Sequence, residues 1–218
     1  MTSEAQSAPA SAHLRRRDDG ALELRVNGVF VMDTVETSSE RALAHEALAV
    51  HPAPSQVLVG GLGLGFTLAE LLTDDRVRRV VVVEQEPQVV TWLREGTVPH
   101  GPALLGDPRV EVVVADVADV LALDQARYDV ILLDVDNGPD NLVHAGNASL
   151  YAAPALARAR RALAPSGVLV IWSASHSPAL EAALRAEFGN AIATSYEVDL
   201  QGREERYWLH LARVACDL

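Results

Sequence analysis

Short, almost wholly apolar stretches alternate with helix-like segments from residue 56 onward, and this alternation constrains the fold more than any other feature of the chain. The stretches that read as strands are Val57–Gly60, Val80–Glu84, Val110–Ala115, Val130–Asp134 and Val168–Trp172. The helical candidates between them are Phe66–Leu72, Pro87–Arg94, Val117–Leu123 and Leu150–Leu163. Strands that are apolar on both sides are typical of a parallel sheet covered on both faces, so we expect a doubly wound, mostly parallel α/β sheet.

The C-terminal part of the chain breaks the alternation. After a helical candidate at Pro178–Phe188, the extended stretches Ala191–Val198 and Arg206–Ala212 flank Gln201-Gly202. Two such stretches around a turn dipeptide predict an antiparallel pair. Together with the five earlier strands they complete a predicted seven-stranded sheet with an antiparallel C-terminal strand.

The N-terminal part predicts a tail followed by a hairpin. Residues 1–19 show no periodicity and are expected to form a disordered tail. Asn27-Gly28 separates the alternating stretches Leu22–Val26 and Val29–Met32. This pattern indicates a short β-hairpin on a type I′ turn.

A helix that Ser38 or Ser39 could cap is expected to follow the hairpin and to run through Leu48. We therefore predict a hairpin with its linking helix over residues 20–48. One Rossmann-like, cofactor-binding transferase domain is predicted over residues 49–218.

The charge of the chain excludes several classes of protein. Acidic residues number 30 against 18 basic ones, which gives a formal net charge of −12. A field of this sign repels phosphate backbones, so we expect no nucleic-acid partner. All the basic residues are arginine, and the absence of lysine excludes Schiff-base lysines and Walker-type phosphate lysines.

The remaining composition favours a cytoplasmic protein. The single cysteine, Cys216, excludes an internal disulfide and a thiolate-rich metal site, which fits a reducing compartment. The chain shows no signal-peptide core and no apolar run of roughly 18 residues, so we expect no membrane partner.

A glycine-rich loop, Gly60-Gly61-Leu62-Gly63-Leu64-Gly65, follows the first predicted strand of the sheet. Small residues let the backbone turn sharply and approach a ligand before a helix begins. In open parallel sheets the ligand lies beyond the carboxyl ends of the strands, where the strand order reverses. The spacing is Gly-x-Gly-x-Gly, whereas a dinucleotide site has Gly-x-Gly-x-x-Gly, so a nicotinamide or flavin oxidoreductase is only a distant alternative.

Carboxylates end the next two predicted strands. Glu84 lies 19 residues after Gly65, where it could accept both hydrogen bonds of a ribose diol, or could be a surface glutamate at a strand end. Asp116 could accept from an adenine amino group, or could cap the helix that begins near Val117, and both roles are compatible.

The fourth strand ends in a loop rich in carboxylates, with Asp134, Asp136, Asn137 and Asp140. Such carboxylates could hold a cationic amine, orient it or receive its proton as a general base. For Asp136 and Asp140, capping of backbone groups in a turn is the alternative interpretation. Asp134 is the predicted catalytic residue.

Three further side chains are expected near the pocket. His45 and His144 are the two candidate histidines, and the ordinary pKa of His144 suits proton transfer, with a solvated loop histidine as the alternative. Tyr151 could line an acceptor site or simply pack its ring. Trp92 and Trp172 are interpreted as packing residues. No other group shows metal-ligand spacing, so we expect no metal.

In order along the chain, these motifs resemble the spermidine synthase family, a branch of the class I S-adenosylmethionine-dependent methyltransferase fold. The Gly60–Gly65 loop resembles the family's cofactor loop, and Val83–Glu86 resembles its ribose-binding strand end. Tyr128–Asp134 resembles the strand that carries the catalytic aspartate, and His45–Leu48 is similar to a His-Glu-x-Leu segment of the family.

The resemblance implies a role for each matching residue. The implied cofactor-binding residues are Gly60, Gly61, Gly63, Gly65, Glu84, Gln85, Asp116, Val117 and Asp134. The predicted acceptor-binding residues are His45, Asp136, Asn137 and Tyr151, together with His144, which its position in the loop suggests independently of the resemblance. Asp134 is the implied catalytic aspartate. The loop after it is shorter than in the family, so the family's second aspartate corresponds to Asp136 or, alternatively, to Asn137. Asp134 and Asp136 are the predicted catalytic pair.

The chain also departs from the family pattern. Leu64 replaces an aspartate that in the family helps to hold the aminopropyl amine, and Ala44 replaces the tyrosine before His45. Two reactions with a small-molecule amine therefore compete: aminopropyl transfer from decarboxylated S-adenosylmethionine and methyl transfer from S-adenosylmethionine. A non-catalytic cofactor-binding protein is the alternative from another class. The front hairpin could pair two copies into a homodimer.

Overall fold

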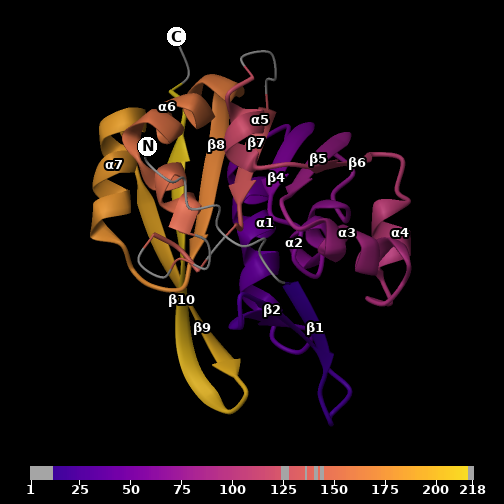
Figure 1. Cartoon of the computed structure of the whole chain (residues 1–218). Coiled ribbons are helices and arrows are strands. Elements are labelled where there is room, and N and C mark those ends of the chain that lie inside the picture. Colours follow the sequence, from indigo (N-terminus) through magenta and orange to yellow (C-terminus); the bar gives the residue numbers. More distant parts are fainter. Residues whose placement is uncertain (1–11, 124–127, 136, 140–141, 143–144, 216–218) are drawn as a thin grey trace, which may run out of the picture.

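The computed structural model describes residues 12–123, 128–135, 137–139, 142 and 145–215 (Figure 1). Its largest element is a seven-stranded sheet in the order β6-β5-β4-β7-β8-β10-β9. The parallel strands are β4 (Gln56–Gly60), β5 (Arg79–Glu84), β6 (Val110–Val114), β7 (Tyr128–Leu133) and β8 (Leu163–Ser173). The last two strands are β9 (Ile192–Leu200) and β10 (Arg203–Arg213), and β10 is antiparallel to both of its neighbours. The predicted doubly wound sheet with an antiparallel C-terminal strand is confirmed.

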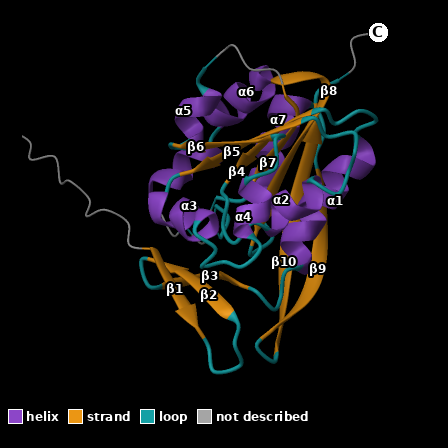
Figure 2. Cartoon of the chain, turned by 90° about the vertical axis from the view of Figure 1, so that its right-hand side faces the viewer, coloured by secondary structure: helices purple, strands orange, loops and turns teal. Residues whose placement is uncertain are grey.

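Helices cover both faces of this sheet (Figure 2). One face carries α1 (Ser38–Val50), α2 (Phe66–Leu71), α3 (Pro87–Arg94) and α4 (Gly101–Leu105). The other face carries α5 (Val117–Leu121), α6 (Ala153–Ala162) and α7 (Pro178–Phe188). Successive residues of β4 show why both faces are apolar, since Val57 and Val59 belong to the first buried cluster and Leu58 belongs to the second.

The strand order places a crevice at one end of the sheet. β4 has β5 on one side and β7 on the other, so the order of the strands reverses between β4 and β7. The loops that follow these two strands diverge to opposite faces, and this is where open α/β sheets bind ligands. The glycine loop follows β4, and Asp134 follows β7.

A small antiparallel sheet precedes the main one, with β1 (Ala12–Arg16), β2 (Leu22–Val26) and β3 (Val29–Asp33) in that order. The prediction of a disordered tail is therefore wrong for β1, which pairs with β2 along its whole length. The guanidinium of Arg17 lies 2.6 Å from the buried carboxylate of Asp33, which ties the end of β1 to β3. Residues 1–11 of the predicted tail lie outside the described residues.

The predicted hairpin is present between β2 and β3. Asn27 and Gly28 have φ angles of 52° and 78°, as a type I′ turn requires at both central positions. Leu24 and Met32 from this sheet belong to the same buried cluster as β4 and α1. The N-terminal unit thus shares a core with the main domain.

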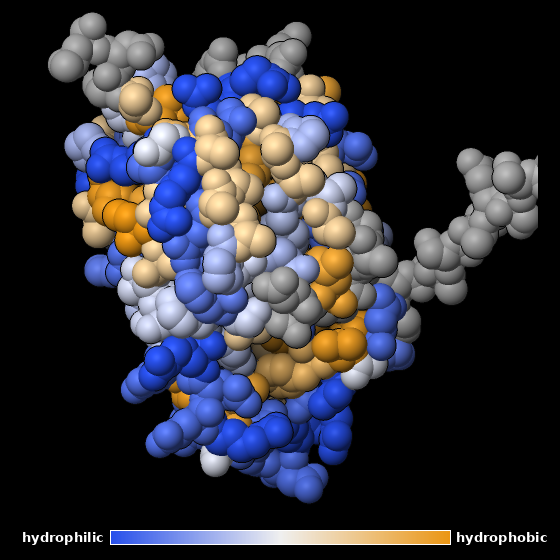
Figure 3. All heavy atoms as spheres, turned by 90° about the vertical axis from the view of Figure 1, so that its left-hand side faces the viewer, coloured by the Kyte–Doolittle hydropathy of each residue, from blue (hydrophilic) through white to orange (hydrophobic). Residues whose placement is uncertain are grey.

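β9 and β10 continue past the main sheet as a two-stranded ribbon. β10 pairs with β8 only over Trp208–Arg213, whereas its pairing with β9 begins at Arg203. The ribbon lies beside the N-terminal sheet at the lower end of the molecule in Figures 1 and 2. On the face drawn in Figure 3, hydrophobic residues gather in a hollow above this hydrophilic end.

One helical prediction is wrong in its extent. The stretch Leu150–Leu163 begins in the last two residues of a 3-10 helix, η1 (Ala145–Tyr151), and continues into α6, and Leu163 already belongs to β8. The break has a local cause. Ala152 is extended (ψ 153°) before α6, and Pro154 in the first turn of α6 has no N–H with which to continue η1.

Two further details differ from expectation. The N-cap of α1 is Thr37, not Ser38 or Ser39, and its side chain makes no capping hydrogen bond. The Ser38 and Ser39 hydroxyls donate to the carboxyl groups of Glu36 and Glu40. α4 was not predicted. Within the described ranges, no helix is long and apolar enough to cross a membrane.

Gly61 allows a sharp test of the glycine loop. Its φ is 92°, and a Cβ built there would lie 2.0 Å from the carbonyl oxygen of Asp134. We expect Gly61→Ala to lower the free energy of unfolding by about 3 kcal/mol, because it adds a backbone clash to the cost of the left-handed conformation. Gly202→Ala is the matched control, since Gly202 has φ 78° with nothing within 4 Å, and should cost about 1 kcal/mol. Urea denaturation of both variants measures this, and equal costs would contradict it.

Candidate functional site

A pocket opens at the carboxyl ends of the central strands, where the strand order reverses. The predicted site residues that line it are Gly61, Gly63, Glu84, Gln85, Asp116, Val117, Asp134 and Asn137. They come from the loops after β4, β5, β6 and β7, so the tertiary fold brings together residues that are far apart in the sequence.

The glycine loop forms one side of the pocket by a close approach of two backbones. The N–H of Asp134 donates to the carbonyl of Gly60 (2.8 Å), and the N–H of Gly61 donates to the carbonyl of Val83 (2.8 Å). Gly63 lies under Met32, whose sulfur a Cβ would approach to 2.6 Å. Gly60 and Gly65 do not line the pocket, because Gly60 ends β4 and Gly65 precedes α2 in a left-handed conformation.

Glu84 holds the glycine loop in place. Its carboxylate is buried and accepts hydrogen bonds from the backbone N–H groups of Leu62 and Glu86, both at 2.8 Å. Burial raises the pKa of Glu84, and these backbone donors oppose that rise. Each carboxylate oxygen has a second lone pair, so Glu84 can still accept from a ligand while Gln85 forms the exposed edge beside it.

Asp116 is the N-cap of α5. Its Oδ1 accepts from the N–H of Ala118 (2.8 Å), so the capping role predicted for it is confirmed. Asp116 also lines the pocket together with the apolar side chains of Ala115 and Val117. A flat heterocycle would therefore meet an apolar surface with a carboxylate at its edge.

Asp134 lies at the centre of the site, directly after β7. Its Oδ2 accepts from the hydroxyl of Thr67 on α2 (3.2 Å). Burial raises the pKa of Asp134 to about 6, the Thr67 hydrogen bond opposes this rise, and the charge of Glu84 adds to it. At neutral pH Asp134 is therefore an ionised carboxylate that binds a proton more tightly than an exposed aspartate does.

Glu40 is a pocket residue that the sequence analysis missed. It is 8% exposed in the first turn of α1, and the Thr67 hydroxyl that contacts Asp134 also lies 3.2 Å from the Glu40 carbonyl oxygen. Burial raises the pKa of Glu40 to about 8, and the negative charge of Asp134 adds to the rise. A glutamate in the first turn of a helix has an ordinary explanation in the helix dipole, so the sequence carried no signal for this role.

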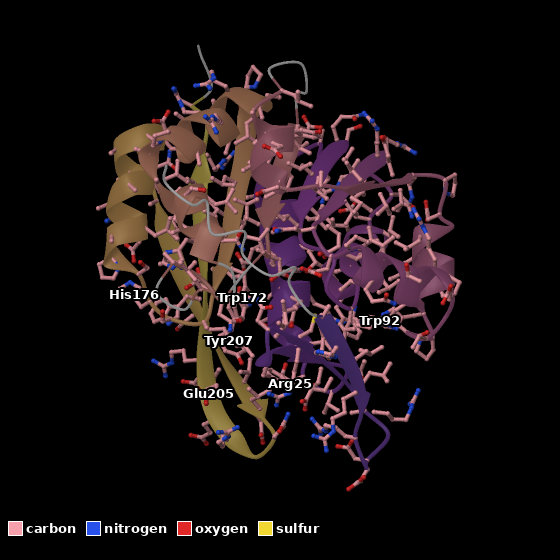
Figure 4. The ribbon with its side chains drawn as sticks, in the orientation of Figure 1. Arg25, Trp92, Trp172, His176, Glu205 and Tyr207 are labelled. Carbon is pink, nitrogen blue, oxygen red and sulfur yellow. The ribbon has the colours of Figure 1, made fainter. Side chains whose placement is uncertain are left out.

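Four of the other missed residues come from the N-terminal sheet. Leu24, Val26, Val31 and Met32 line the pocket together with Trp172 of β8, and we call these five side chains the apolar wall. Trp172 was predicted to be a packing residue, and it also lines the pocket (Figure 4). Nothing in the local sequence of a hairpin indicates that it closes a site formed by a distant sheet.

Some predicted site residues lie elsewhere. His45 is exposed on α1 and lines a second, more open pocket with Glu70 and Arg76. Tyr151 is buried in the hydrophobic cluster on the face of the sheet that α5, α6 and α7 cover, and it does not line the main pocket. Asp136 and His144 lie outside the described residues, as does Asp140.

Leu64 has no contact with the pocket, because its side chain is fully buried in the core. Asn137 does line it, at a sharp turn in which Gly138 packs against Ser173. The N–H of Ala174 donates to the carbonyl of Asn137 (3.1 Å), which joins the loop after β7 to the end of β8.

The electrostatics of the lining favour a cation. Its ionisable residues, within the part of the chain that the structure describes, are Glu40, Glu84, Glu86, Asp116 and Asp134, and none is basic. At neutral pH Asp134 is ionised whereas Glu40 mostly holds its proton, and each ionised carboxylate in a partly dehydrated pocket attracts sulfonium and ammonium groups and repels carboxylates. The described residues also contain no group of three or more histidine, cysteine, aspartate or glutamate side chains that could hold a metal ion.

Glu40 makes the stability of the fold depend on pH. Because its pKa is about 8 in the folded protein against an ordinary value of 4.5, the folded state binds this proton more tightly than the unfolded chain does. That stabilisation is complete below pH 4.5 and is lost as the pH rises through 8. We expect Glu40→Gln to gain stability over the wild type by up to about 1 kcal/mol per pH unit across this range.

Urea unfolding near both ends of this pH range measures the gain. Glu95→Gln, at the exposed end of α3, is the matched control and should show no such trend. A difference between Glu40→Gln and the wild type that does not change with pH would contradict the prediction.

Comparison with known proteins places the chain in a family. The spermine/spermidine synthase domain matches residues 36–196. A polyamine aminopropyltransferase from Aeropyrum pernix is 32% identical over 166 residues, which are 71% of this chain and 52% of the relative. Putrescine N-methyltransferase 4 from Nicotiana tabacum is 31% identical over 166 residues, which are 72% of this chain and 39% of the relative.

Solved structures have the same fold. A spermidine synthase in complex with the transition-state analogue AdoDATO superposes with a TM-score of 0.80 at 22% identity, over 98% of this chain and 73% of the other. Human methyltransferase-like protein 13 in complex with SAH gives a TM-score of 0.61 at 18% identity, over 82% of this chain and 83% of the other.

The chain spans about a third to a half of the length of the first curated relatives. The match to the family domain nevertheless covers most of the chain, and it includes α1, the glycine loop and the strand before Asp134. The chain therefore belongs to the spermine/spermidine synthase family, on a class I methyltransferase fold.

Proposed function

We propose that this protein transfers an aminopropyl group from decarboxylated S-adenosylmethionine to a small-molecule amine. The observation that carries the proposal is the acidic lining of the pocket around Asp134 at the reversal of strand order. Family membership and the shared fold support the same reaction.

The residues present fit an adenosyl sulfonium. The backbone of Gly61 and Gly63 leaves room for the chain around the sulfur, Glu84 and Gln85 would hold the ribose, and Asp116 with Val117 would hold the adenine. When bound, the sulfonium supplies an electron-poor carbon next to a good leaving group. The protein then has to position the amine in line with that carbon and to accept the proton that the ammonium group loses.

Asp134 would accept that proton as a general base. An amine attacks only after it has lost its proton, and Asp134 is ionised above about pH 6. Its burial makes it a better base than an exposed aspartate, and Thr67 fixes one of its carboxylate oxygens. Asp136, predicted as its catalytic partner, stays a prediction. Glu40 is the second described carboxyl beside the reaction centre.

The pocket also favours the decarboxylated cofactor. The carboxylate of S-adenosylmethionine would enter a lining that holds acids and, among its described residues, no base. The decarboxylated form lacks that group and carries only positive charge. Methyl transfer is the second candidate, because Leu64 is buried where the family pattern has an acid, and putrescine N-methyltransferases are among the relatives.

Calorimetric titration with each form of the cofactor separates the two reactions. We expect the decarboxylated form to bind at least about tenfold more tightly, because it avoids like-charge repulsion. Tighter binding of S-adenosylmethionine would favour methyl transfer. Binding of neither form would overturn the proposed cofactor class.

Asp134→Asn tests the catalytic carboxylate. We expect turnover to fall by about 10²–10⁴-fold with cofactor affinity nearly unchanged, because the amide keeps the shape but cannot accept the proton. Asp119→Asn, on the exposed side of α5, is the matched control and should retain full activity. Rates of methylthioadenosine release measure both variants, and retained activity in Asp134→Asn would remove Asp134 from the mechanism.

The pH profile tests the same carboxylate independently. We expect kcat/KM of the wild type to rise through about pH 6 as Asp134 ionises. Thr67→Val removes the hydrogen bond that lowers the pKa of Asp134, so the acidic limb should move to higher pH. An unchanged limb would show that another group controls it.

The compartment, the partner and the oligomeric state of the protein are also proposed. We infer a cytoplasmic enzyme with a small-molecule amine as its partner. Association of two copies through the N-terminal sheet rests on β1 and β3, which are the edge strands of that sheet among the described residues. Light scattering that reports a monomer at all concentrations would reject the homodimer.

A further inference from the structure

The cofactor proposed above carries a second cation, the ammonium group at the end of its aminopropyl chain. The glycine loop, along which that chain would lie, contains only glycine and leucine over residues 60–65. Leu64 is fully buried in the core. The loop itself therefore offers the ammonium no carboxylate, so a counter-charge has to come from another element.

Glu40 reaches the pocket from the first turn of α1, and its contacts hold it beside the end of the glycine loop. It lines the pocket and is 8% exposed. Its carbonyl accepts from the hydroxyl of Thr67 (3.2 Å), which lies in α2 directly after that loop. The guanidinium of Arg41 lies 3.2 Å from the carboxylate of Glu70, also on α2. These contacts fix the start of α1 against the helix that the cofactor loop precedes.

The surroundings of the Glu40 carboxyl show that it faces the pocket. Burial, the charge of Glu205 and then that of Glu40 raise the pKa of Tyr207 to about 12. Tyr207 packs against Trp172 of the pocket lining, with ring centroids 4.8 Å apart (Figure 4). On the other side, the charge of Asp134 adds to the effect of burial on Glu40. A carboxyl group close to both neighbours lies on the side of α1 that is turned toward the cavity.

The ionisable groups that face this carboxyl are acidic. Burial raises the pKa of Glu40 to about 8, and the charges of Asp134, after β7, and of Glu36, before α1, add to the rise. Tyr207 of β10 stays uncharged near neutral pH. Arg41, the next residue of α1, is turned toward α2. A cation that enters the pocket therefore favours the ionised form of Glu40.

We propose that Glu40 binds the terminal ammonium group of the cofactor's aminopropyl chain, and that it releases its own proton to solvent as the ammonium binds. The inference rests on the proposed function, because it names the residue that recognises the cofactor in the same pocket. The hydroxyl of Ser39 donates to Oε2 of Glu40 (2.9 Å), and the remaining lone pairs of the carboxylate can accept from the ammonium. Asp134 stays available to accept the proton of the incoming amine.

Two unreactive thioethers that differ only in the amine test this assignment. They are 5′-(3-aminopropylthio)-5′-deoxyadenosine and 5′-propylthio-5′-deoxyadenosine, and neither carries a sulfonium. Calorimetry at pH 7 in buffers of different ionisation enthalpy counts the protons released on binding. We expect the aminopropyl thioether to release about one proton more than the propyl thioether does.

The affinities of the same two ligands should depend on pH in a matching way. We expect the aminopropyl thioether to bind about tenfold more tightly than the propyl thioether at pH 7, and about 100-fold more tightly at pH 9. The advantage grows because Glu40 is already ionised above about pH 8 and no longer has to lose a proton.

Three variants identify the carboxyl group that is responsible. Glu40→Gln should abolish both the extra proton and the advantage of the amine, while an unchanged affinity for the propyl thioether shows that the pocket is folded. Asp134→Asn should retain the advantage. Glu95→Gln, at the exposed end of α3, is the matched control and should change neither quantity. An advantage that survives in Glu40→Gln, or that is lost in Asp134→Asn alone, would overturn the assignment.

The propyl thioether separates failure of this inference from failure of the proposed function. If it binds and the amine adds neither affinity nor proton release, the adenosine site stands and the assignment of Glu40 is rejected. If neither thioether binds, the proposed cofactor class is rejected, and the assignment of Glu40 with it.

Discussion

The site depends on the close contact between two backbones at the point where the strand order reverses. The loop after β4 passes the start of the loop after β7 so closely that no side chain fits between Gly61 and the carbonyl of Asp134. The hydrogen bond from the Asp134 N–H to the Gly60 carbonyl holds the two loops in this register. Two side chains of the site interact directly with the loops that meet here. The Glu84 carboxyl group accepts from the N–H of Leu62 in the glycine loop. The hydroxyl of Thr67, in α2 directly after that loop, donates to Asp134.

The proton affinity of the carboxyl groups in the pocket follows from burial as much as from residue type. An exposed aspartate is a weak base, whereas the dehydrated carboxyl of Asp134 has its pKa raised to about 6 and that of Glu40 is raised to about 8. The same carboxyl groups that attract a cation can therefore hold and release a proton near neutral pH. This combination suits a reaction in which an ammonium must become an amine before it attacks a sulfonium carbon.

The N-terminal sheet forms part of the pocket lining. Met32 lies against Gly63 and accepts from the Leu64 N–H at 3.1 Å, so the small sheet is joined directly to the cofactor loop. Leu24 and Met32 share a buried cluster with Trp172, which continues the apolar surface from the small sheet onto the main one. The apolar part of the pocket lining thus comes from elements that carry none of the family's motifs for the cofactor.

The sequence by itself determined the order of the elements, the parallel sheet with its antiparallel last strand, the glycine loop, and the carboxylates at the strand ends. These features are local, since they depend on apolar periodicity and on residues a few positions apart. It could not reveal Glu40 or Trp172 as pocket residues, because each has an ordinary local explanation. Glu40 fits the helix dipole in the first turn of α1, and Trp172 fits packing in the core. Nor could it show that His45 points away from the pocket while Glu40 points into it, since both lie on α1 and only the packing of that helix decides which face is buried. Long-range packing between α1, the N-terminal sheet and β8 made those choices, and a single sequence carries almost no local signal of such contacts.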